Sequence, residues 1–246
     1  MFVYLYAAFL FMEMEQNNRP ELAEKISIEL KCVYGQPNYI CSDRRANLLM
    51  LPISKRRKVP KLKRKLGGKK AFHEKIVLDR SKKFHDNVQN LLLPPLELLY
   101  IWNVFHMMAK QPKLLLPMLN SVENKLKIHT KSSDASKCLD QYCYLIFMKG
   151  VIKRHLDEKP AAIKLFEEVI SCKKRIKEEL HLLPQSYFEL GMIYRDLKRT
   201  SEAKRMLKRA RDDYSNYLSE TMINFRVWNA LDLIKKEKAA ADDPSK

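Results

Sequence analysis

The sequence predicts an all-α protein in which antiparallel helix pairs stack side by side as an α-solenoid. Glycine is scarce, at 5 of 246 residues, which disfavours tight β-turns and glycine-rich phosphate-binding loops because both need this residue. From residue 94 onward, apolar residues recur with the spacing of a helix and are interrupted by short turns. One arrangement of small and large residues also occurs twice at a fixed offset, which indicates stacked structural repeats.

The expected helices follow from local signals. Pro95 suits the first turn of a helix. The turns at residues 110–112 and 157–160 are short enough to make their flanking helices antiparallel neighbours. We expect the residues 173–183 to lengthen the second helix of the first repeat. The helices predicted for this part of the chain span residues 95–109, 113–129, 134–156, 160–181, 184–197, 200–215 and 217–238.

We interpret the chain as three regions. The first is an N-terminal helix pair, the second a basic, irregular insertion or linker that carries Gly and Pro and lacks a helical period, and the third a helical repeat domain. They span residues 1–33, 34–70 and 71–246, with repeats at about 143–176 and 184–217 and a capping helix at 217–238.

The repeat itself matches the tetratricopeptide pattern. Gly191 and Ala203 are small, which lets the two helices of a pair approach closely, while Leu207 fills the space beside their contact. Such a pair cannot bury its apolar face alone and must stack on its neighbours. In the preceding repeat Gly150, Ala162, Phe166 and Val169 each lie 41 residues before Gly191, Ala203, Leu207 and Ala210.

Three segments resemble the tetratricopeptide repeat protein 39 family: PPLELLYIWNVF at 94–105, ARDDYSNYLSETMINFR at 210–226 and VPKLKRKLGGK at 59–69. The resemblance covers most of residues 59–235, and more weakly 1–33, and corresponds to the C-terminal portion of the longer family members. It implies a helical-repeat adaptor with no catalytic residues. It also implies a family-level link to lipid homeostasis, protein turnover or cilia.

The predicted function is a non-enzymatic scaffold or adaptor that binds a protein partner through the concave face of its repeats. First helices line that face, which is apolar and aromatic with arginines at one end. It suits an amphipathic helix or an extended peptide with an acidic end. Alternatively, the same side chains pack against a neighbouring helix of the chain. The candidate residues are Tyr144, Phe147, Val151, Arg154, Gln185, Phe188, Met192 and Arg195.

A second hypothesis rests on residues 55–70, where ten of sixteen residues are Lys or Arg. The run suits a nuclear-import signal, a nucleic-acid or anionic-membrane surface, or a solvated loop. Interleaved aromatic residues are missing, which argues against base stacking. The alternative function is therefore a peripheral nucleic-acid or anionic-membrane binder, and its candidate residues are Lys55, Arg56, Arg57, Lys58, Lys61, Lys63, Arg64 and Lys65.

No motif predicts catalysis, a metal site or a cofactor. The sequence GGKK at 67–70 lacks the rest of a phosphate-binding loop, and the five cysteines include no C-x-x-C pair. The apolar run at 2–12 is too short to span a bilayer and predicts a buried helix. We therefore expect a cytoplasmic or nuclear protein without a transmembrane segment.

Overall fold

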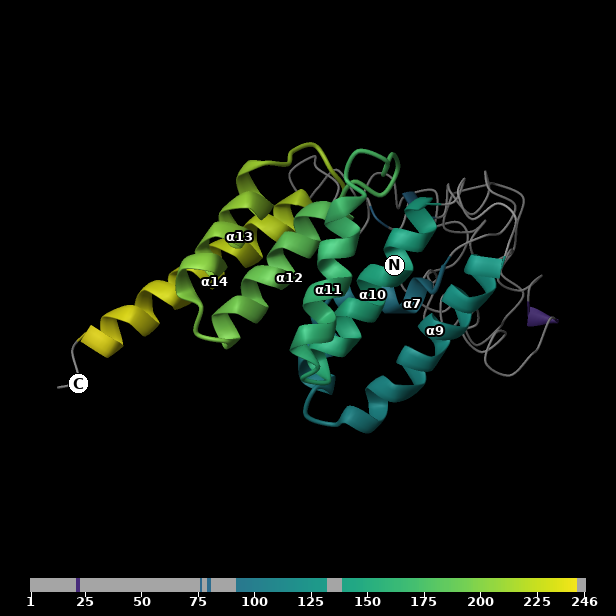
Figure 1. The fold of residues 1–246 in the computed structure, drawn as a ribbon, viewed down its shortest axis with the longest axis horizontal. Coiled ribbons are helices and arrows are strands. Elements are labelled where there is room, and N and C mark those ends of the chain that lie inside the picture. Colours follow the sequence, from purple (N-terminus) through teal and green to yellow (C-terminus); the bar gives the residue numbers. More distant parts are fainter. Residues whose placement is uncertain (1–20, 23–75, 77–78, 81–91, 132–138, 243–246) are drawn as a thin grey trace, which may run out of the picture. The chain divides into compact units, whose positions relative to one another are not determined.

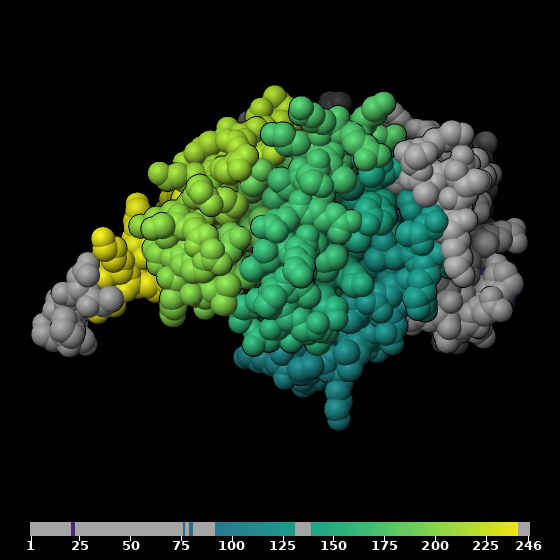
Figure 2. Space-filling model, in the orientation of Figure 1, coloured from purple at the N-terminus to yellow at the C-terminus, as the bar shows by residue number. Residues whose placement is uncertain are grey.

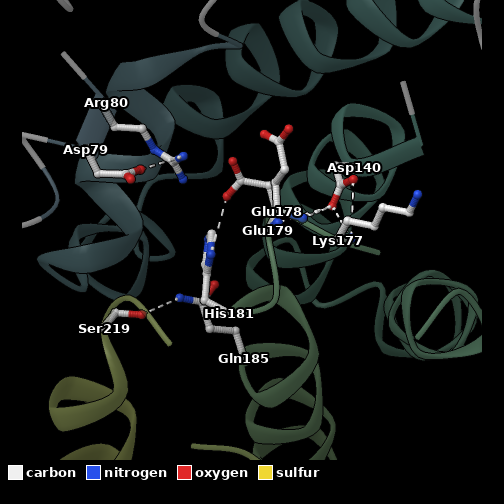
Figure 3. Close-up of polar contacts among 9 residues, drawn as sticks. All are labelled: Asp79, Arg80, Asp140, Lys177, Glu178, Glu179, His181, Gln185 and Ser219. Atoms are coloured by element: carbon white, nitrogen blue, oxygen red, sulfur yellow. Dashed lines mark hydrogen bonds and ion pairs between the residues drawn. The ribbon is translucent and has the colours of Figure 1, made fainter. Parts of the chain in front are cut away.

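The computed structural model describes residues 21–22, 76, 79–80, 92–131 and 139–242 (Figure 1). The predicted N-terminal helix pair, apart from residues 21–22, and the basic insertion lie outside the described residues. The chain divides into two units, Met1–Pro95 and Leu96–Lys246. In the first unit, Arg80 forms an ion pair of 3.4 Å with Asp79 (Figure 3).

Helices make up every regular element of the described residues, which confirms the predicted all-α class. Helices that follow one another along the chain run largely antiparallel to each other (Figure 1). In chain order they are α7 (Pro94–Ile101), α8 (Val104–Met108), the 3₁₀ turn η2 (Pro112–Leu114), α9 (Leu115–Lys131), α10 (Leu139–His155), α11 (Lys159–Ser171), α12 (Leu182–Asp196), α13 (Thr200–Asp212) and α14 (Glu220–Asp242).

The single helix predicted over 95–109 is wrong, because the chain forms two helices there. Asn103 has a φ of 58° and a ψ of 27°, the left-handed conformation, between α7 and α8. Asparagine tolerates this conformation better than other side chains. The N–H of Asn103 donates to the carbonyl oxygen of Tyr100 at 3.0 Å, which closes α7 with a tighter turn.

The predicted extension of the second helix in the first repeat is also wrong. Helix α11 ends at Ser171, and residues 172–181 form a loop that begins and ends with turns. The carboxylate of Asp140 accepts hydrogen bonds of 3.1 Å from the backbone N–H groups of Lys177, Glu178 and Glu179 (Figure 3). Because a side chain of α10 binds these N–H groups, the segment folds as a loop instead of a further helical turn.

Close contacts between small and large residues hold the two helix pairs α10–α11 and α12–α13 together. A Cβ atom on Gly150 would lie 2.8 Å from Cε1 of Phe166, and one on Gly191 would lie 2.7 Å from Cγ of Leu207. Both distances are below ordinary van der Waals contact. Glycine is therefore required at these two positions so that each second helix can reach its first helix.

The pairs then stack in sequence, with α9 against α10, α11 against α12, and α13 against α14. In Figure 2 these helices form a continuous packed surface on the face in view, with α14 in yellow emerging at its edge. Helix α14 contacts both α12 and α13 and contributes to the core from one side. Its fully or nearly buried apolar residues are Met222, Ile223, Val227, Ala230 and Ile234.

Candidate protein-binding surfaces

Most of the predicted concave face is buried against other parts of the same chain. On α10, Tyr144 is 6% exposed and both Phe147 and Val151 are fully buried. On α12, Gln185 is 3% and Phe188 is 7% exposed. A partner therefore cannot reach these five side chains in this conformation.

The remaining three predicted residues lie nearer to solvent. The Arg154 side chain is 12% exposed and the Arg195 side chain 25%, while Met192 is half-buried. Arg195 forms an ion pair of 3.4 Å with Glu237 of α14. Of the eight predicted residues, Met192 and Arg195 are the ones that still offer surface to a partner.

The chain's own segment from Leu96 to Phe105 covers the α10 part of this face. The ring of Tyr100 meets the ring of Phe147 edge-on, with centroids 5.1 Å apart. Its hydroxyl donates to Oε1 of Glu189 on α12 at 3.1 Å. Arg226 of α14 donates to the carbonyl oxygens of Tyr100 and Ile101, each at 2.9 Å. Tyr100 thus links α7 to three helices of the repeat domain.

The charges around Tyr100 are balanced in the interior. Glu189 is 2% exposed and forms an ion pair with Arg154, which also lies 3.9 Å from Asp196. Burial, followed by the nearby carboxylate of Glu189, raises the pKa of Tyr100 well above its ordinary value. The phenol therefore stays neutral and acts as a hydrogen-bond donor, so this cluster has a structural use.

Polar contacts also fix Gln185 and the loop beside it. The side-chain amide of Gln185 donates to Oγ of Ser219 at 3.2 Å, which ties α12 to the start of α14 (Figure 3). His181 pairs with Glu179 at 3.3 Å in the same region. Gln185 is therefore a packing residue in this structure. The partner-binding role of the predicted face as a whole stays a prediction.

A different surface carries the largest exposed aromatic side chains among the described residues. On α14, Phe225 is 65% and Trp228 is 62% exposed, one helical turn apart. They lie 34 residues after Gly191 and Tyr194, at positions that are buried on α12. The sequence carried a signal for this surface, because Phe225 occupies a position where the repeat needs a small residue.

A cavity of about 340 Å³ opens at the junction between the loop after α11 and the loop after α13. Leu183 and Tyr214 contribute to its walls, and Lys173 and Lys174 are exposed at its rim. The hydroxyl of Tyr217, another wall residue, is enclosed and has no hydrogen-bond partner among the described residues. Because that oxygen is not accessible, the polar side chains that the cavity offers a ligand are the exposed ones of Lys173, Lys174, Asp213 and Ser215.

The described part of the chain holds no group of three or more His, Cys, Asp or Glu residues placed to bind a metal ion. Burial, followed by the neighbouring Cys172, raises the pKa of Cys143 to about 12, so its thiol stays protonated near neutral pH. None of the helices in the described residues is long and apolar enough to cross a membrane. The eight basic candidates from Lys55 to Lys65 lie outside the described residues.

The stacked helix pairs, with glycine at each close contact, define a helical-repeat protein of the tetratricopeptide class. The sequence model of the family described as Iml2/Tetratricopeptide repeat protein 39 matches residues 1–156. The chain belongs to this family, which confirms the resemblance. The segments at 59–69 and 94–105 lie within the matched residues, and the segment at 210–226 lies outside them.

One curated relative is similar over most of this chain. It is the tetratricopeptide repeat protein ttc-39B of Caenorhabditis elegans, 29% identical over 174 residues, which are 71% of this chain. The aligned region covers 29% of the relative, so the chain spans less than a third of that protein's length. No solved structure matches the chain.

Proposed function

We propose that this chain is a non-enzymatic helical-repeat scaffold that binds a protein partner. The observation that supports this most is the exposed aromatic pair Phe225 and Trp228 on α14. Large aromatic side chains contribute most of the binding energy in many protein interfaces, because they bury a large apolar area with few rotatable bonds. Leaving both in water is unfavourable unless a partner covers them.

Other exposed apolar side chains do not form an equivalent site. Met107 and Leu116 are 70% and 50% exposed, but they are aliphatic and lie on different helices. Isolated apolar residues at the surface are common and need no partner. Phe225 and Trp228 differ because both are aromatic and lie one helical turn apart on the same helix.

The test replaces both aromatic residues, as Phe225→Gln with Trp228→Gln, in the full chain. A matched control carries Met107→Gln with Leu116→Gln, which removes exposed apolar area elsewhere. Equal amounts of each folded protein are used to capture binding proteins from cell extract, and the recovered proteins are quantified. We expect a protein that is retained by wild type and control but lost from the aromatic variant. Equal recovery by all three chains would contradict the proposal.

The alternative, a nucleic-acid or anionic-membrane binder acting through residues 55–70, predicts a different salt response. Binding that neutralises 6–10 phosphates weakens by roughly 10³–10⁵ between 50 and 200 mM salt, whereas burial of aromatic area is little affected. Loss of binding at physiological salt, unchanged by the two glutamine substitutions, would support the basic segment. Replacing Lys55–Lys58 with serine would then abolish it.

A further inference from the structure

Two cysteines that the proposed function does not use belong to the helix pair α10–α11. Cys143 lies on α10 and is 1% exposed, whereas Cys172 is half-buried directly after the last residue of α11. Both carry free thiols. They are far apart in the sequence, so their relative position depends on how the two helices pack.

The contacts between the two helices place these cysteines opposite each other. Near the start of α10, Asp140 accepts hydrogen bonds from the backbone N–H groups of residues 177–179, which follow α11 (Figure 3). Two-thirds of the way along α10, Gly150 lies against the ring of Phe166 on α11. The helices are therefore antiparallel, and residues of α10 between these two contacts lie against residues 167–176. One cysteine lies in each of these two intervals.

The two thiols also interact with each other. Burial raises the pKa of Cys143 to about 12, and the next causes in size are the electrostatic effect of Cys172 and a side-chain hydrogen bond with it. Such an interaction requires the two sulfur atoms to be neighbours. A disulfide needs two side chains that face each other across a short gap. The packing of the helices and the interaction between the thiols both indicate that arrangement.

We propose that Cys143 and Cys172 form a site of reversible oxidation, at which a peroxide converts the two thiols to a disulfide that fastens the end of α11 to α10. An accessible cysteine beside a second cysteine that resolves it is the arrangement found at reversible thiol-oxidation sites. This site does not involve the aromatic pair on α14. It therefore goes beyond the scaffold function and does not depend on it.

The reaction starts at Cys172, because solvent reaches its sulfur whereas the buried thiol of Cys143 stays protonated near neutral pH. The thiolate of Cys172 attacks one oxygen of hydrogen peroxide, and the O–O bond breaks. The hydroxide that leaves takes up a proton to form water, and Cys172 becomes a sulfenic acid.

The second step closes the disulfide. The sulfur of Cys143 attacks the sulfur of Cys172, the S–S bond forms and the S–O bond breaks. The hydroxide that leaves takes the proton of the Cys143 thiol and becomes a second molecule of water. In total the two thiols lose two electrons and two protons, and one peroxide is reduced to two waters.

The disulfide should restrict the loop that follows α11. This loop, residues 172–181, is attached near its far end by the hydrogen bonds to Asp140, and its residues Lys173 and Lys174 are exposed at the rim of the cavity. A covalent bond at Cys172 would attach the near end to α10 as well. Local opening of residues 173–176 should then become rarer, which slows exchange of their amide hydrogens.

The first test maps the disulfides that form in the full chain. Folded protein is treated with hydrogen peroxide, the remaining thiols are blocked with N-ethylmaleimide, and the unreduced digest is analysed by mass spectrometry. We expect a peptide pair that joins Cys143 to Cys172, that dithiothreitol separates and that is absent from Cys172→Ser. No disulfide, or a bond from Cys172 to Cys32, Cys41 or Cys138 in preference to Cys143, would overturn the inference.

The matched control is the same chain oxidised while unfolded in urea. There the pairing follows distance along the sequence, so Cys138 with Cys143 should form the most abundant disulfide. If the bond between Cys143 and Cys172 is equally abundant in the folded and the unfolded chain, the fold does not create the site and the inference fails.

The second test measures what the disulfide does. Amide hydrogen exchange at residues 173–176 should be several-fold slower in oxidised than in reduced wild type, and peroxide should not change it in Cys172→Ser. The midpoint of thermal unfolding should rise by roughly 5–10 °C on oxidation, because the bond constrains the unfolded chain. A disulfide that leaves both the exchange rates and the midpoint unchanged would show that it does not fasten the loop, which would overturn the inference.

Discussion

Gly191 offers the sharpest test of how the helix pair α12–α13 is built. A Cβ atom at this position would lie 2.7 Å from Cγ and 2.9 Å from Cδ2 of Leu207, and 3.3 Å from the carbonyl oxygen of Ala203. Carbon atoms normally meet at about 3.5–4.0 Å, so the helices would have to separate by several tenths of an ångström to about 1 Å. Leu207 is fully buried and cannot swing into solvent.

The variant Gly191→Leu should therefore destabilise the protein by about 2–4 kcal/mol. Replacing glycine within a helix contributes up to about 1 kcal/mol in the opposite direction, but overpacking by a whole side chain exceeds that gain. For a domain of this size the midpoint of thermal unfolding should fall by roughly 5–15 °C. Urea titration followed by circular dichroism at 222 nm measures the change in the free energy of unfolding.

Two control variants isolate the cause. Lys208→Leu adds the same apolar side chain to an exposed position next to Leu207 and should change stability by less than about 0.5 kcal/mol. The combination of Gly191→Leu with Leu207→Ala should cost less than the sum of the single changes by at least about 1 kcal/mol, because the clashing branch is gone. A Gly191→Leu protein that unfolds at the wild-type urea concentration would refute the close helix contact.

Three further predictions concern buried or half-buried polar groups. Asp140→Asn should destabilise the protein by about 1–2 kcal/mol, because a neutral amide is a weaker acceptor than a carboxylate for the N–H groups of residues 177–179. Amide hydrogen exchange at these three residues should become faster. Unchanged exchange would show that the loop does not depend on the carboxylate. Tyr100→Phe should cost about 1–3 kcal/mol, since Oε1 of Glu189 loses its donor, and wild-type urea stability would argue against that bond. Burial, followed by the positive charge of Arg154, lowers the pKa of His155 to about 4. As the pH falls, His155 of the unfolded chain is therefore protonated before His155 of the folded chain. The free energy of unfolding should decrease as the pH falls from about 6.5 to 4. His155→Phe, which keeps the stack on Phe105, should reduce that decrease, and urea midpoints at pH 7 and 4.5 that change equally in both proteins would contradict the assignment.

The close helix contacts could be predicted from sequence because they depend on spacing alone. Gly150 and Gly191 each lie a fixed distance from a large residue on the following helix, and the repeat occurs twice. Such short-range patterns are reliable because each pair is one local unit of structure. The family resemblance depended on the same kind of local signal.

The parts that the sequence did not reveal depend on contacts between distant residues. Asp140 accepts hydrogen bonds from a loop residue 37 positions later, and no local signal distinguishes that loop from a further helical turn. The sequence did not show that part of the predicted concave face is buried within the chain, where Tyr100 packs on Phe147 and Glu189, which lie far along the chain. Periodicity showed which residues share a helix face but not which segment covers that face.

The most direct test of the scaffold function is the affinity of the purified partner for wild type and for Phe225→Gln with Trp228→Gln, measured at 50 and 200 mM salt. We predict at least a roughly 30-fold loss of affinity in the variant, the effect expected of one interface hot spot of about 2 kcal/mol or more, with an unchanged melting temperature. We also predict that wild-type affinity falls by less than about tenfold between the two salt concentrations. Equal affinity of both proteins, with binding abolished at 200 mM salt, would contradict this function and assign binding to the basic segment.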